Sequence, residues 1–66
     1  MDLETIRQYL SQYRIKNDVR LEKMSSDIGI SVGSLWKFLN EAVKPNERTK
    51  YKIEKYLEEN GVSIDI

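Results

Sequence analysis

Lysine and arginine side chains, which can bind anions, are unevenly placed along this 66-residue chain. The whole chain is neutral, with 11 basic and 11 acidic residues. Residues 31–56 nevertheless hold six basic groups against three acidic ones, and residues 57–66 hold three acidic groups and no basic one. A local positive excess suits an anionic partner, whereas a solvated helix face gives the same pattern without any partner.

The sequence lacks the side chains on which disulfide bonds, covalent catalysis and zinc binding most often depend. The sequence has no cysteine and no histidine, which removes disulfides, thiolates, the commonest zinc ligands and the usual general base. The carboxylates suggest no catalytic pair, because Glu58 and Glu59 fit a solvated helix end and Asp18 and Asp27 fit capping or surface positions. We therefore expect no enzyme activity, no metal and no cofactor.

One glycine indicates how the helices that carry these basic residues are arranged. A helix that stops abruptly usually ends on a left-handed residue, a conformation that costs Gly29 almost nothing. Two residues later, Ser31 can cap the next helix through its hydroxyl. Ser25 is small where two crossing helices would come closest. Residues 21–40 therefore predict a helix-turn-helix that packs through Met24, Ile28, Ile30, Leu35 and Phe38.

Helical periodicity covers most of the rest of the chain. The apolar spacing predicts an all-α fold with helices over residues 2–14, 18–28, 32–41 and 47–60. Pro45 and Asn46 mark the start of the last helix, because proline has no amide hydrogen to leave unsatisfied and asparagine is a good cap. The expected inward-facing residues are Leu3, Ile6, Leu10 and Tyr13, then Leu21, Met24, Ser25 and Ile28, then Leu35, Phe38, Leu39 and Ala42, and finally Thr49, Ile53, Tyr56 and Leu57.

The chain length predicts a single domain over residues 1–66, with a helix-turn-helix core at 19–41 and a tail at 62–66. A core of this size is marginal, so a second chain would help to stabilise it. No apolar run is long enough to cross a membrane, and Asp2 and Glu4 stand where a leader would be basic. We expect a soluble, cytoplasmic protein, with a possible second copy paired through the tail residues Val62, Ile64 and Ile66.

Between residues 3 and 63 the chain resembles the lambda-repressor-like superfamily, the Cro/CI or XRE-type helix-turn-helix domains. Residues 21–40 are similar to the family's signature, with Ser25 at its small position and Gly29 at its turn. Residues 44–49 are similar to the loop that leads into the family's fourth helix. The resemblance implies a compact four-helix DNA-binding domain.

Two departures from the family pattern are visible. Ser25 stands where alanine is commoner, and the segment from Gly61, which often opens a fifth helix, stops at Ile66. The fifth helix is a frequent dimer element, so the resemblance leaves the means of dimerisation open.

The resemblance places helix 32–41 in the DNA major groove. Lys37 can then donate to guanine O6 and N7, Val32 can touch a thymine methyl, and Gly33 permits a close approach. One long donor, with no arginine or glutamine in the first turn, implies modest base specificity and more weight on phosphate contacts and DNA shape. The implied base-reading residues are Ser31, Val32, Gly33, Trp36, Lys37 and Asn40.

Phosphate contacts are expected from groups that flank the groove. Each of these groups alone also fits a solvated surface position. Trp36 leaves two alternatives open, since it can lie along the protein surface or in a dimer contact, or it can touch a sugar-phosphate or a base edge. The phosphate candidates are Arg20, Ser34, Lys44, Asn46, Arg48 and Lys50.

These expectations describe a sequence-specific transcriptional regulator of double-stranded DNA. A repressor of phage or mobile-element type is favoured over an activator, because blocking a promoter needs occupancy alone. A homodimer would bind two half-sites about 34 Å apart. The alternative is a protein-interaction module with the same fold and no DNA partner, which the neutral net charge and the apolar Trp36 and Val32 favour.

Overall fold

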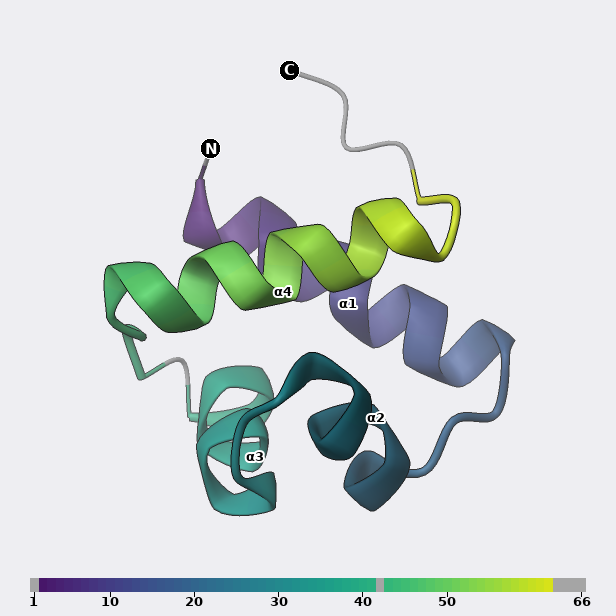
Figure 1. Cartoon of the computed structure of the whole chain (residues 1–66), viewed down its shortest axis with the longest axis horizontal. Coiled ribbons are helices and arrows are strands. Elements are labelled where there is room, and N and C mark those ends of the chain that lie inside the picture. Colours follow the sequence, from purple (N-terminus) through teal and green to yellow (C-terminus); the bar gives the residue numbers. More distant parts are fainter. Residues whose placement is uncertain (1, 42, 63–66) are drawn as a thin grey trace.

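Four α-helices make up the part of the chain that the computed structural model describes, residues 2–41 and 43–62. They are α1 (Leu3–Lys16), α2 (Leu21–Ile28), α3 (Val32–Asn40) and α4 (Glu47–Glu59). α1 and α4 lie side by side, and α2 and α3 pack against them from below in the view of Figure 1. No strand occurs within the described ranges, so the structure has the expected all-α, four-helix fold.

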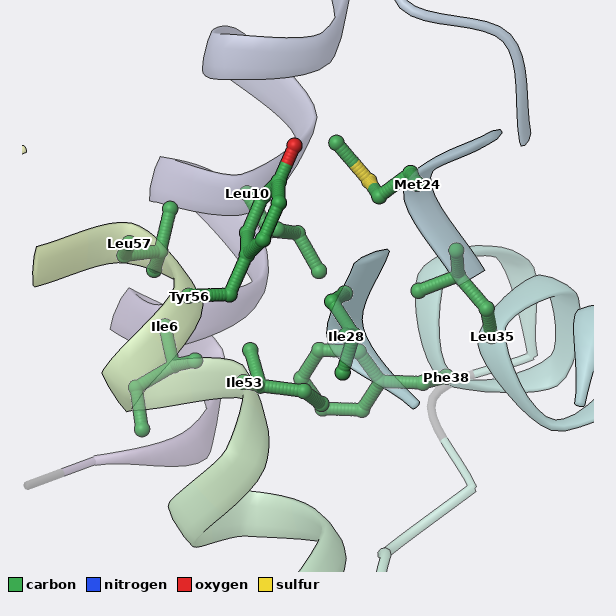
Figure 2. Close-up of a cluster of buried hydrophobic side chains, with 9 residues drawn as sticks. All are labelled: Ile6, Leu10, Met24, Ile28, Leu35, Phe38, Ile53, Tyr56 and Leu57. Atoms are coloured by element: carbon green, nitrogen blue, oxygen red, sulfur yellow. The ribbon is translucent and has the colours of Figure 1, made fainter. Parts of the chain in front are cut away.

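One apolar core joins all four helices. In Figure 2, Phe38 extends from α3 toward Ile53 of α4, and the side chains of α1 and α2 close the cluster around them. Every predicted inward-facing residue that the structure describes is buried or half-buried, and Ala42 lies outside the described residues. The buried apolar side chains are Ile6, Leu10, Met24, Ile28, Leu35, Phe38, Ile53, Tyr56 and Leu57.

Two tyrosines join α1 to α4 at the edge of this core. The rings of Tyr13 and Tyr56 meet edge to face, with centroids 5.8 Å apart and an interplanar angle of 89°. The Tyr13 hydroxyl donates to Oδ1 of Asn60 at 3.1 Å. Burial, with smaller effects of Tyr13 and Asp27, raises the pKa of Tyr56 to about 12. Both rings therefore serve packing, as their positions beside the apolar stripes suggest.

The start of α2 is the clearest correction to the sequence analysis. We predicted a helix from residue 18, but α2 begins at Leu21. Asp18 has a φ of +52°, and the neighbouring Val19 N–H donates back to the Arg14 carbonyl at 3.0 Å. Asp18 thus terminates α1, in the left-handed position that usually follows a helix, and does not open α2. α1 extends to Lys16, two residues beyond the predicted end.

Both ends of α4 have well-defined caps. Asn46 Oδ1 accepts from the Thr49 amide at 2.8 Å, which confirms the predicted N-cap. At the other end, the Val62 amide donates to the Leu57 carbonyl at 2.9 Å, the bond that defines a Schellman motif. Val62 is half-buried against the core. The tail residues Ile64 and Ile66 lie outside the described residues, and none of the described helices has the length and hydropathy to cross a membrane.

Candidate nucleic-acid interface

The turn between α2 and α3 is held by backbone and side-chain contacts around Gly29. Gly29 has φ 91° and ψ 34°, the predicted left-handed conformation. The amides of Gly29 and Ile30 both donate to the Ser25 carbonyl, at 2.8 and 3.0 Å. The Ser25 hydroxyl, on a side chain buried between the helices, donates to the Glu22 carbonyl at 2.9 Å. Serine therefore fits this position because its polar group is satisfied within its own helix.

α3 begins at the predicted cap. The Ser31 hydroxyl accepts from the Ser34 amide at 3.1 Å and donates to the Ser34 hydroxyl at 2.9 Å. The cap fixes where the helix starts, and therefore which residues of its first turn point outward.

The two sides of α3 have opposite roles. Leu35 and Phe38 anchor the helix in the core, and Leu39 is half-buried. The remaining side of the helix faces solvent. All six predicted base-reading residues are exposed, namely Ser31, Val32, Gly33, Trp36, Lys37 and Asn40.

Two large apolar side chains lie on this exposed side, and a third follows just beyond the helix. Val32 is 43% exposed and Trp36 46% exposed, and they lie one helical turn apart. Val43, just beyond α3, is 49% exposed, and its amide donates to the Lys37 carbonyl at 3.4 Å. The Asn40 amide is folded back, with Nδ2 donating to the Trp36 carbonyl at 3.1 Å. We call Val32, Gly33, Trp36, Lys37 and Asn40 the outer face of α3.

Gly33 has no packing role. A Cβ added at Gly33 would meet nothing within 4 Å, so alanine, a better helix former, would fit there. Glycine on an exposed helix surface does allow another molecule to approach the backbone closely. The position therefore fits a contact surface better than a packing requirement.

The predicted phosphate-binding residues lie in three separate segments. Arg20 is the last residue before α2, Ser34 is in the first turn of α3, and the other four lie between residue 44 and the first turn of α4. Arg20, Lys44 and Arg48 are exposed, whereas Lys50 is half-buried. The two ion pairs among the described residues, Arg7–Glu4 and Lys23–Asp27, involve none of these cations.

Two of the uncharged phosphate-binding candidates also have structural roles. Ser34 and Asn46 both take part in helix capping, so their side chains are partly occupied. Asn46 retains its amide group as a donor, because only its oxygen is used in the cap.

Lys52 makes a structural contact that the sequence analysis missed. Its Nζ donates to the Gly29 carbonyl at 3.2 Å and so ties α4 to the turn. Lys52 also lines a hollow of about 490 Å³ between α2 and α4, together with Arg48, Tyr51 and Lys55. The sequence does contain a sign that Lys52 lies beside Arg48 and Lys55, because positions 48, 52 and 55 have the spacing that places side chains on one helix face.

No protein-family model, curated protein or solved structure matches this chain. Among the described residues, acidic side chains form no cluster of three that would hold a metal ion. The geometry of α3 and its flanking cations is therefore the basis for a functional assignment.

Proposed function

We propose that this protein is a DNA-binding transcriptional regulator of the lambda-repressor-like type, with α3 lying in the major groove. The observation that carries the proposal is the division of α3 into two sides. Leu35 and Phe38 fix the helix in the core, while every residue of the outer face is exposed to solvent. Gly29 and the Ser31 cap set the position of that face relative to α2.

The flanking cations support the same docking. Arg20 precedes α2, and Lys44 and Arg48 follow α3, so positive charge is available on segments before and after the helix-turn-helix. Such groups position a protein on the phosphate backbone, whereas side chains of the inserted helix contact base edges. Lys37 is the cation of the outer face and would donate to guanine O6 and N7.

A titration with random-sequence duplex DNA tests the proposal. Trp36 is the only tryptophan of the chain, so its fluorescence reports directly on the outer face. We expect binding at low salt and, if four to six phosphates are contacted, a slope of log affinity against log salt of about −4 to −5. Absence of binding even at low salt would contradict the proposal.

Three single substitutions define the surface used. Lys37→Ala and Arg48→Ala should both weaken binding, because each removes a cation from the proposed interface. Lys16→Ala is the matched control, since Lys16 is also exposed but lies in the last turn of α1, outside the helix-turn-helix and the loop that follows it. An equal loss of affinity in all three variants would indicate unspecific attraction to positive charge.

Repression by a homodimer is part of the same proposal. Two copies would place their α3 helices in successive major grooves, about 34 Å apart. Removal of residues 63–66 tests the tail as the dimer contact and leaves the Val62 cap of α4 intact. We expect a smaller sedimentation mass for the truncated protein on DNA, and an unchanged mass would refute a dimer role for Ile64 and Ile66.

A protein-interaction module remains the second candidate function. The exposed Val32, Trp36 and Val43 are the observation that favours it, because aromatic and aliphatic side chains dominate the centres of protein interfaces. The same titration separates the two candidates, since an interaction module would leave Trp36 fluorescence unchanged when DNA is added.

A further inference from the structure

We infer that the outer face of α3 recognises methyl groups in the DNA major groove, above all the C5-methyl of thymine, through Val32 and Trp36. The inference rests on the proposed function and names the feature of the base pairs that α3 reads. It follows from which groups of the outer face are free and which are already engaged.

The free groups are mostly apolar. Val32 and Trp36 leave 43% and 46% of their surfaces in water and lie four residues apart on one side of the helix. The C5-methyl of thymine is the apolar group among the donors and acceptors on the major-groove edges. Contact with that methyl removes apolar surface from water on both molecules, which is favourable.

The polar groups around them are few and partly engaged. The Ser31 hydroxyl bonds to Ser34, and the Asn40 amide uses one N–H on the Trp36 carbonyl at 3.1 Å, which leaves its oxygen and its second N–H. Lys37 is exposed and takes no part in the ion pairs among the described residues. Lys37 and the rest of the Asn40 amide are then the polar side-chain groups of the outer face, and hydrogen bonds from so few groups give the helix limited ability to discriminate base pairs.

Gly33 makes the methyl contact sterically accessible. It lies between Val32 and Trp36 in the first turn of α3, and its surroundings are open to at least 4 Å from where a Cβ would lie. The absent side chain lets the start of the helix approach the base edges closely. Short side chains such as valine need that approach to reach a methyl group.

Two duplexes that differ only in this methyl test the inference. One is an alternating A·T duplex, and the other has deoxyuridine in place of every thymidine, so both carry the same phosphates. We expect the thymine duplex to bind about fourfold more tightly for each methyl group that the protein buries. Equal binding to both duplexes would overturn the inference and leave the proposed function standing, whereas binding to neither would contradict the proposed function itself.

Variants separate methyl contact from any effect of the methyl on DNA shape. Val32→Ser and Trp36→Gln should each bring the ratio of the two affinities closer to one, and circular dichroism would verify their helix content. Lys37→Ala should weaken binding to both duplexes and leave the ratio unchanged. If neither Val32→Ser nor Trp36→Gln alters the ratio, the preference comes from DNA shape and the inference is wrong.

Discussion

The two ends of α2 are built very differently. At its C-terminal end, Gly29 takes the left-handed conformation, two amides converge on the Ser25 carbonyl, and Lys52 of α4 binds the Gly29 carbonyl. At its N-terminal end, Arg20 occupies the cap position without any side-chain hydrogen bond to the helix. One end thus has several stabilising contacts and the other lacks the commonest one.

Under the proposed function, this difference separates a structural end from an end that would contact DNA. The C-terminal end fixes the angle between α2 and α3, so any looseness there would misplace the outer face of α3. The N-terminal end carries arginine where serine, threonine, aspartate or asparagine would satisfy a free amide. Residues that break a local rule without a structural gain are expected at functional sites, and an arginine beside free helix amides suits a DNA phosphate.

The largest effect is expected at the structural end. Gly29→Ala should lower the free energy of unfolding by about 1–2 kcal/mol, because a residue with a Cβ pays that much in the left-handed region. The cost is purely conformational, since a Cβ at Gly29 would meet nothing within 4 Å. Urea denaturation measures the change.

Gly33→Ala is the matched control for that substitution. It also adds one methyl group to an open position, but without a positive φ, so stability should be unchanged or slightly higher. Equal destabilisation by both substitutions would show that the conformation of Gly29 does not limit the stability of the turn.

An intermediate effect of opposite sign is expected at the N-terminal end of α2. Arg20→Ser should raise the free energy of unfolding by about 1 kcal/mol, because the serine hydroxyl would cap α2. The same substitution should weaken binding to random duplex DNA, because it removes a proposed phosphate contact. Thermal unfolding and the DNA titration measure the two effects separately, and a variant that is more stable and still binds normally would remove Arg20 from the interface.

The contrast between the ends of α2 also explains what the sequence predicts well. Gly29 and Ser31 act through their own backbone and near neighbours, so their residue types suffice to predict the turn and the cap. The start of α2 was predicted wrongly because Asp18, an N-cap candidate by type, takes a positive φ that ends α1. Residue type alone does not tell which of two neighbouring helices such a residue serves.

Contacts between segments that are distant in the sequence cannot be predicted from local sequence patterns. The bond from Lys52 to the Gly29 carbonyl spans 23 residues and depends on how α4 packs over the turn. Asn40 was predicted to read bases, and the bond from its Nδ2 to the Trp36 carbonyl could not be predicted because it depends on the side-chain rotamer in the folded helix.

The smallest effect is expected where α4 supports the turn. Lys52→Met keeps most of the aliphatic stem but removes the ammonium that donates to the Gly29 carbonyl, and should lower the free energy of unfolding by about 0.5 kcal/mol. Lys55→Met is the control, because it removes the same charge from the same helix. A difference between the two that shrinks with added salt would show an electrostatic contact with the end of α2. Identical urea midpoints would show that the turn is held by Gly29 and the core alone, and the comparison between the two ends of α2 would then rest on backbone conformation.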